Sequence, residues 1–362
     1  MAYTTIDKPS DYFNTVLYTG TGADNRAVTG VGFQPDWLWI KDRSSSFSHA
    51  LFDVVRGSSK MLVTQGTEAE QTNPGSGGIT SFDTNGFTTD AGSGGNPYRN
   101  TNQNNDAYVS WNWKAGTSFS NSAGANGASI ASTGSISTTA GFSIISFTGD
   151  GNTGAKIAHG LGVKPDMIIL KMRSVGDTSW GVYHKAIGAT KYLRLNNTGG
   201  TVTSNTRWNN IEPTSTVFTL GSSGDVNQNN ATIIAYCFAD VQGYSKMGSY
   251  VGNGSDTPNG VFVYLGFTPA YILIKATDSN SWVIVNNKSP DNSNPVDNSL
   301  AADSAAAETT GDSNTTFNFL SNGFKTNGNS GNNNSSGQEY VFMAFAQRPF
   351  VTSTGVPATA RW

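Results

Sequence analysis

An element that occurs three times along the chain constrains the fold more than any other feature. In each copy a glycine and a proline mark a turn, and an uninterrupted apolar run that ends in lysine follows. The copies read GFQPDWLWIK at residues 32–41, GVKPDMIILK at residues 162–171 and GFTPAYILIK at residues 266–275. Because sequence repeats report repeated structural units, the chain should contain three units of related fold.

Two further elements keep the same order around each copy. An aromatic-x-Gly-x-Gly turn precedes it, at residues 18–22, 147–151 and 250–254. An aromatic-rich run closes it, at residues 108–113, 233–238 and 340–345. Copies one and three also carry Asn-Gly-Phe, a hairpin signal in which Asn-Gly supplies positive φ angles. Short β-favouring runs between Gly, Asn and Pro turns predict an all-β chain of three tandem β-sandwich, jelly-roll-like domains.

The composition disfavours long helices. Charged residues make up 13% of the chain, against about 25% in typical soluble domains. Asn, Ser, Thr and Gly carry the polarity instead. Ser and Asn side chains compete for backbone hydrogen bonds, and Gly loses the most entropy in a helix. A short helix is expected only in the Ala-rich stretch at residues 298–308.

The repeat also predicts the domain boundaries. We expect sandwiches at residues 1–116, 141–242 and 243–352, a Ser/Ala/Gly/Thr linker at residues 117–140 and a tail at residues 353–362. The linker predicts that the first domain hangs more freely than the other two. An alternative for part of the linker is a short added strand within residues 129–137.

The apolar runs predict how the strands are covered. Runs that are apolar without alternation are typical of central strands buried on both faces. In the closing runs one position is always aromatic, and we expect its side chains to face the core between the two sheets of each sandwich. These residues are Trp113, Phe238 and Phe345.

Each apolar run ends in an equivalent lysine, at Lys41, Lys171 and Lys275. A ligand site is one interpretation, but a catalytic residue rarely recurs in every domain. We therefore expect strand-end lysines that carry their charge to solvent along an apolar stem.

His49, Asp53 and Arg56 form the most suggestive polar group in the chain. A hydrolytic triad would need a nucleophile on a strained elbow, and no Gly-x-Ser-x-Gly elbow is evident between a strand and a helix. With five scattered Glu, nothing singles out an acid and a nucleophile for glycoside hydrolysis either. We expect a buried, hydrogen-bonded network and no enzyme activity.

Metal and cofactor signals are weak. Three His and one Cys leave no pattern for a structural zinc site. Oxygen side chains on Gly turns make Asp150, Asn152 and Asp256 weak calcium candidates, although the twelve-residue loop that ends in Glu is missing. No cofactor is expected, and the Gly-x-Gly turns lack the helix that would present its N-terminus to a phosphate.

Two aromatic and arginine pairs lie in very polar loops, Tyr98 with Arg99 and Arg207 with Trp208. An aromatic face could stack on a sugar while neighbouring Asn amides bond its hydroxyl groups. These residues are our candidates for saccharide binding without cleavage. The alternative, that each ring covers the edge of its own domain, is the favoured interpretation.

Charge and hydropathy limit the partners. A net charge of −3 and a pI near 5.6 give no basic field for nucleic acid. No stretch approaches the ~18 apolar residues of a membrane span, and the first ten residues lack the apolar core of a secretory signal. Cys237 lies in an apolar run and is expected to be buried. We expect a soluble protein made in the cytosol.

Residues 1–116 resemble a family of multi-domain proteins of marine tailed phages, particularly those that infect cyanobacteria. The resemblance rests on MAYTTI at residues 1–6, QPDWLWIK at residues 34–41, HALFDVVRG at residues 49–57 and WNWKAG at residues 111–116. The second and third copies lack the HALFDVVRG segment, so their similarity is looser. Such proteins are named only as structural, and the family carries no established catalytic residues.

The resemblance implies a virion component, either a tail fibre or tail-associated protein for host attachment, or a capsid decoration or head appendage. A non-catalytic carbohydrate-binding module is an alternative. The implied partners are other virion proteins, further copies of the chain, with a trimer favoured, and host surface polysaccharide. Assembly in the host cytoplasm and residence in the virion follow from the same resemblance.

Overall fold

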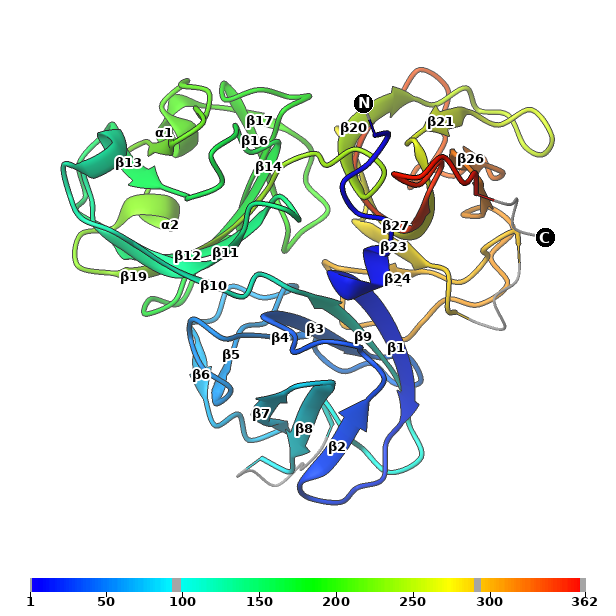
Figure 1. Ribbon diagram of the computed structural model, residues 1–362, viewed down its shortest axis with the longest axis horizontal. Coiled ribbons are helices and arrows are strands. Elements are labelled where there is room, and N and C mark those ends of the chain that lie inside the picture. Colours follow the sequence, from blue (N-terminus) through cyan, green and yellow to red (C-terminus); the bar gives the residue numbers. More distant parts are fainter. Residues whose placement is uncertain (1, 93–98, 290–293, 359–362) are drawn as a thin grey trace.

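Three lobes surround a common centre in the computed structural model (Figure 1). The structure describes residues 2–92, 99–289 and 294–358. Strands make up 42% of the chain and helices 4%, so the prediction of an all-β fold is confirmed. We call the lobes unit 1 (residues 13–113), unit 2 (residues 117–238) and unit 3 (residues 245–349), after the strands that they contain.

Unit 1 contains two packed sheets and a short ribbon. The larger sheet has the order β1 (Phe13–Thr19), β9 (Ala107–Trp113), β3 (Trp37–Asp42), β4 (Ala50–Asp53). The smaller has the order β2 (Arg26–Thr29), β8 (Gly86–Asp90), β7 (Gly78–Asp83), and the ribbon pairs β5 (Lys60–Met61) with β6 (Gln71–Thr72). A 3-10 turn, η1 (Pro9–Asp11), precedes β1.

Unit 2 has a larger sheet of eight strands. Their order is β10 (Thr117–Asn121), β11 (Ser132–Ser137), β12 (Phe142–Thr148), β19 (Thr232–Phe238), β14 (Met167–Met172), β15 (Gly181–His184), β16 (Lys191–Arg194), β17 (Val202–Thr203). The smaller sheet pairs β13 (Ala155–Ala158) with β18 (Val217–Leu220). The short helices are η2 (Ala125–Gly127), α1 (Asn205–Trp208) and α2 (Gly224–Asn227).

Unit 3 again has two sheets. The larger has the order β20 (Ser245–Val251), β27 (Glu339–Pro349), β22 (Phe267–Ala276), β23 (Val283–Asn286), β24 (Leu300–Ala301). The smaller has the order β21 (Phe262–Tyr264), β26 (Gly323–Thr326), β25 (Phe317–Leu320). The prediction of a short helix within residues 298–308 is wrong. This stretch contains β24, and Glu308 N donates to Arg43 O of unit 1.

The three larger sheets share one strand order. In each, the strand that leads into the opening turn pairs with the closing strand, which pairs with the apolar run: β1-β9-β3, β12-β19-β14 and β20-β27-β22. The apolar runs are buried along their whole length, which confirms that they are central strands. This order is what three copies of one unit would produce, although the tandem repeat itself remains an interpretation of the sequence.

The opening turns show why their glycines are needed. In unit 1 a Cβ at Gly20 would lie 1.8 Å from the carbonyl oxygen of Gln103. The buried amide of Asn102 holds the turn, since its Oδ1 accepts from Thr21 N at 2.9 Å and its Nδ2 donates to Ala23 O at 2.8 Å. The amides of Asn227 and Asn334 make the corresponding bonds in units 2 and 3.

The two faces of each larger sheet bury different cores. Along β3, Leu38 and Ile40 pack toward the smaller sheet of unit 1, whereas Trp37 and Trp39 pack toward the centre of the molecule. Strands β14 and β22 divide their side chains in the same way. One central cluster therefore joins all three units.

Aromatic rings fill this centre. Trp37 of unit 1 stacks on Tyr236 of unit 2 at 4.7 Å between ring centroids, and Phe13 of unit 1 stacks on Phe345 of unit 3 at 5.1 Å. Phe238 of unit 2 meets Phe345 edge-on. Such contacts add to the apolar burial that stabilises the fold.

Two predictions about this region are wrong. Trp113, Phe238 and Phe345 face the central cluster, not the core between the two sheets of their own unit. Unit 1 does not hang freely, because its aromatic side chains are part of the same cluster. Residues 117–140 contain β10, η2 and β11, and β11 pairs with β12, so the alternative of an added strand within residues 129–137 is the one observed.

Candidate functional site

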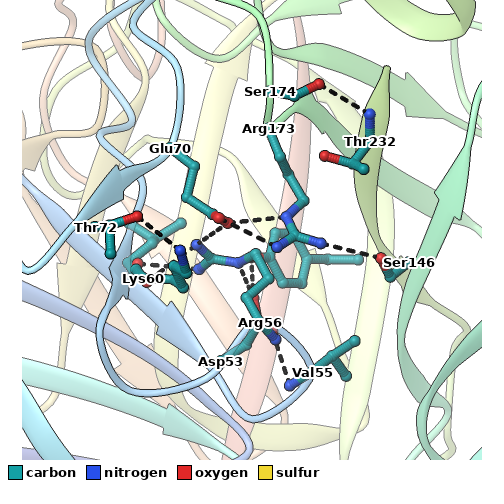
Figure 2. Close-up of polar contacts among 12 residues, drawn as sticks. Asp53, Val55, Arg56, Lys60, Glu70, Thr72, Ser146, Arg173, Ser174 and Thr232 are labelled. Atoms are coloured by element: carbon teal, nitrogen blue, oxygen red, sulfur yellow. Dashed lines mark hydrogen bonds and ion pairs between the residues drawn. The ribbon is translucent and has the colours of Figure 1, made fainter. Parts of the chain in front are cut away.

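The polar group expected around Asp53 lies at the junction of units 1 and 2 (Figure 2). Asp53 Oδ1 accepts from the backbone N of Val55 and Arg56, at 3.0 and 2.9 Å. Its Oδ2 accepts from Arg56 Nε at 2.5 Å and from the hydroxyl of Tyr236, in unit 2, at 2.7 Å. Both side chains of the Asp53–Arg56 pair are fully buried.

Glu70 extends the network into unit 2. Figure 2 shows its carboxylate between the guanidinium groups of Arg56 and Arg173. Arg173 binds it through Nε at 2.8 Å and Nη2 at 3.1 Å, and donates from Nη1 to Ser146 Oγ at 3.2 Å. Arg56 also donates to the carbonyl oxygens of Leu51 and Lys60. The expectation of a buried, hydrogen-bonded network therefore holds for Asp53 and Arg56.

Each charged group in this network contacts a group of opposite charge. Burial alone would lower the pKa of Arg56, but the adjacent Asp53 carboxylate, Tyr236 and Glu70 raise it above its ordinary value. Burial raises the pKa of Tyr236 far above its ordinary value. Asp53 and Arg56 thus have their oxygen and nitrogen atoms engaged with protein partners. The arrangement acts as a clamp between two units.

His49 belongs to a different junction. Its Nδ1 accepts from Trp39 Nε1 at 2.8 Å, and its Nε2 lies 3.0 Å from the carbonyl oxygen of Ala301 in unit 3. Burial lowers the pKa of His49 to about 3, so the ring is neutral and serves as a bridge. Trp180 Nε1 reaches Val63 O and Trp282 Nε1 reaches Arg194 O at the other two junctions, at 2.9 and 2.8 Å.

Backbone bonds also recur at the three junctions. Glu70 N donates to Arg173 O, Thr201 N to Thr277 O and Glu308 N to Arg43 O, at 2.8, 2.8 and 2.9 Å. Unit 1 thus contacts unit 2, unit 2 contacts unit 3, and unit 3 contacts unit 1. The Arg43–Glu308 ion pair, at 2.7 Å, strengthens the last of these junctions. The contacts form a closed ring.

The prediction for the strand-end lysines is wrong. Lys41, Lys171 and Lys275 are fully buried. Their ammonium groups donate to loop carbonyl oxygens, and two of them cross a junction: Lys171 Nζ lies 3.1 Å from Thr67 O, and Lys275 Nζ lies 3.1 Å from Thr198 O. Burial lowers the pKa of each lysine to about 8. The neighbouring unit covers the position that would face water in an isolated sandwich.

The candidate sugar-binding pairs are placed differently. Arg207 and Trp208 lie in α1 and are buried: Arg207 pairs with Asp225, and the Trp208 ring packs in the core of unit 2. The prediction of a sugar-stacking face is therefore wrong for Trp208. Arg99 lies over the ring of Phe47, at 5.0 Å from its centroid. Tyr98 lies outside the described residues.

The calcium candidates belong to the opening turns. Asp150 Oδ1 accepts from Asn152 N at 2.9 Å and from the Asn227 amide at 3.1 Å. Although burial opposes it, these hydrogen bonds hold the pKa of Asp150 below its ordinary value. Asp256 of unit 3 accepts from Asn329 at 3.3 Å. Within residues 2–92, 99–289 and 294–358, no three His, Cys, Asp or Glu side chains gather as a metal-binding group.

A surface groove that the sequence reasoning missed lies between units 2 and 3. It consists of two adjoining hollows of about 590 and 370 Å³ that share Tyr3, Asp240 and Gln242. The larger hollow reaches Thr138, Thr139 and Val163 of unit 2, and the smaller reaches Lys246, Tyr264 and Leu265 of unit 3. We call these hollows together the Tyr3 groove.

Hydrogen bonds fix the aromatic wall of the Tyr3 groove. Tyr3 Oη donates to Gly266 O at 2.8 Å and lies 3.3 Å from Tyr264 Oη. Lys246 Nζ donates to Tyr264 O at 2.8 Å and lies 5.3 Å from the centroid of that ring. Burial, together with the bond to Tyr264, raises the pKa of Tyr3, so its hydroxyl stays protonated. Sequence reasoning could have found Tyr264 from the run Phe262, Val263, Tyr264, because alternate residues of a strand share one face and two aromatic side chains would lie together there.

Comparisons with known proteins add a family but no activity. The model of a family described as a domain of unknown function (DUF7483) matches residues 8–349, which span all three units. No curated protein and no solved structure matches the chain. Within the described ranges, none of the helices has the length and apolar character of a membrane span.

Proposed function

We propose that this chain, which belongs to the DUF7483 family of domains of unknown function, is a structural component of a bacteriophage particle. Within the particle we favour a tail fibre or tail-associated protein that takes part in host attachment. A capsid decoration or head appendage protein is the alternative. The proposed particle follows from the resemblance of residues 1–116 to marine phage proteins.

The observation that carries a structural role is the closed ring of three units around one aromatic core. Each junction combines a backbone bond with a bridging His or Trp ring, and two junctions also have a buried lysine that donates across them. Regions of a protein that have few buried contacts open most easily. Here no unit can separate without exposing the central cluster to water, so opening of a whole unit is costly. Such a body suits a protein that persists outside a cell.

The polar chemistry supports a non-catalytic role. The side chains of the Asp53 network form hydrogen bonds with protein groups, and the ammonium groups of the three lysines donate to carbonyl oxygens. Release of reducing sugar from host polysaccharide by the purified chain would contradict this part of the proposal.

Mass spectrometry of gradient-purified particles tests the location. We expect the chain among the particle proteins, at a few tens of copies for a tail position and several hundred for a capsid position. Its absence from particles would overturn the proposal. The implied self-association, with a trimer favoured, is tested by mass photometry at micromolar concentration, where a strict monomer would remove self-association from the proposal.

A non-catalytic carbohydrate-binding module is a second candidate, and the Tyr3 groove favours it. The groove has the exposed Tyr264 ring and the half-buried Tyr3 ring beside amide and hydroxyl groups, which is a pattern by which proteins hold sugars without cleaving them. This candidate needs no particle, so the two are separated by the particle analysis above.

A further inference from the structure

Two aromatic side chains of unit 3 are exposed to solvent, whereas most aromatic rings of the molecule are buried. Phe262 and Tyr264 are 46% and 49% exposed, whereas Val263 between them is buried. They are the only aromatic residues among the exposed large apolar side chains of the described residues. Because side chains alternate along a strand, both rings leave the same face of β21, about 7 Å apart.

The position of β21 gives these rings a shared surface. It is the edge strand of the smaller sheet of unit 3, paired only with β26 in that sheet. The N-terminus lies beside β20 and β21 in Figure 1, and Tyr3 meets the Tyr264 hydroxyl there. Tyr264 lines the Tyr3 groove directly, and Phe262 extends the aromatic surface along the strand beyond it.

A single exposed apolar side chain needs no explanation, since much of any protein surface is apolar. Here two rings stand side by side next to a groove of ligand-pocket size, about 590 Å³ in its larger part. The Tyr264 ring also has Lys246 Nζ 5.3 Å from its centroid, and its hydroxyl lies 3.3 Å from that of Tyr3. A ring with such contacts loses little conformational freedom when a ligand stacks on it.

The polar groups of the groove suit hydroxyl groups more than charges. Gln242 offers an exposed amide, and Thr138 and Thr139 offer exposed hydroxyls. The one carboxylate, Asp240, is paired with Lys185 at 2.6 Å, which also lies 3.3 Å from Asp166. The one ammonium group, that of Lys246, donates to Tyr264 O. Amides and hydroxyls both donate and accept, as bonding to sugar hydroxyls requires.

We propose that the Tyr3 groove and the adjacent rings of β21 bind a neutral oligosaccharide, with the pyranose C–H faces stacked on Tyr264 and Phe262. The inference deepens the attachment role given under Proposed function and rests on it for its biological meaning. The groove itself supplies the binding chemistry.

The test uses the whole chain and neutral gluco-, manno- and galacto-oligosaccharides, titrated by calorimetry and by saturation-transfer NMR. We expect binding by the unaltered chain and a loss of affinity of about tenfold or more in Tyr264→Ala and in Phe262→Ala, equivalent to about 1.4 kcal/mol each. Both positions are exposed, so the melting temperature should stay within a few degrees of the unaltered chain.

Phe47→Ala and Val356→Ala serve as matched controls. Phe47 carries an aromatic ring under Arg99, and Val356 is an exposed apolar residue that does not line the groove. Both should keep full affinity. Binding that survives both groove substitutions, or falls equally in the controls, would overturn the proposal.

Two further outcomes separate the groove from the particle. If none of the oligosaccharides binds while the chain is found in purified particles, the groove proposal fails and the structural role stands. If the oligosaccharides bind through Tyr264 and Phe262 while the particles lack the chain, the groove stands and the phage role fails. Crosslinking of β21 to a protein partner without any sugar binding would also overturn the groove proposal.

Discussion

The ends of β4 and β23 use the same turn with different chemistry. Asp53 Oδ1 accepts from the backbone N of Val55 and Arg56, and Asn286 Oδ1 accepts from the backbone N of Lys288 and Ser289 at 2.9 and 3.1 Å. Only Asp53 is also paired with a buried guanidinium group and with a tyrosine of another unit. The hydrogen bonds of the turn are common to both units, whereas the ionic clamp belongs to one junction.

This difference indicates that the junctions share backbone hydrogen bonds and do not share ion pairs. The bond from Thr201 N to Thr277 O matches the bond from Glu70 N to Arg173 O, although no ion pair accompanies the former among the described residues. A junction can therefore form with or without a buried ion pair. Where a buried ion pair is present, removal of one partner leaves the other charge uncompensated and lowers the free energy of unfolding more.

The largest effect is expected for Asp53→Ala. It leaves the Arg56 guanidinium buried without its closest carboxylate and should lower the free energy of unfolding by about 3–5 kcal/mol. Asn286→Ala is the matched variant, and the loss of turn bonds alone should cost about 1–2 kcal/mol. Chemical denaturation measures both. Equal losses would show that the ionic clamp adds nothing to the shared turn.

The buried lysines predict a pH dependence to which all three units contribute. Their pKa of about 8 in the folded state lies below the ordinary lysine value, so the unfolded chain binds more protons above pH 8. The free energy of unfolding should therefore rise between about pH 8 and pH 10, by about 1 kcal/mol per lysine after allowing for solvent screening. Above pH 10 the raised pKa values of buried tyrosines oppose the rise.

Denaturation at several pH values checks this, and Lys275→Met should reduce the slope by about a third. A slope that is unchanged in Lys275→Met would mean that the lysine ammonium is not desolvated at the junction of units 2 and 3.

The bridging indoles give a smaller and equal effect at two junctions. Trp180→Phe and Trp282→Phe each remove a hydrogen bond to a carbonyl oxygen of the neighbouring unit and part of a buried ring. Each should cost about 1–2 kcal/mol. Thermal unfolding compares the pair. A large difference between them would contradict the view that the junctions share one geometry.

The smallest effect is expected at the surface. Lys164 pairs with Glu212 at 2.7 Å, but both side chains are more than 40% exposed. Lys164→Gln should change the free energy of unfolding by less than about 0.5 kcal/mol. A loss close to that of Asp53→Ala would mean that burial does not distinguish the two ion pairs.

Local signals predicted the fold class and many of its strands. The apolar runs, the Asn-Gly turns and the scarcity of helix formers act over a few residues, and the structure has strands where they indicated them. The hairpin signal at Asn85 corresponds to the β7–β8 turn, and that at Asn322 to the β25–β26 turn. These features need no knowledge of what lies across the molecule.

The contacts between units could not be predicted in the same way. Both faces of the run at Trp37 are apolar, so the pattern does not reveal that one face meets another unit. Lys171 looked like a strand-end residue in water because Thr67, which accepts its hydrogen bond, is far away in the chain. Trp208 sits among polar neighbours in sequence, yet a short helix turns its ring into the core.

The closed ring of junctions has a consequence for chain continuity. Units 1 and 3 are distant in sequence, but Arg43, His49 and Thr64 tie them together as closely as neighbouring units are tied. A cut in the peptide chain that breaks none of the junction bonds leaves each unit in contact with the other two. We therefore expect that a single proteolytic nick in the 122–131 loop between β10 and β11 would leave the three lobes assembled, held by surface complementarity where the peptide bond is gone.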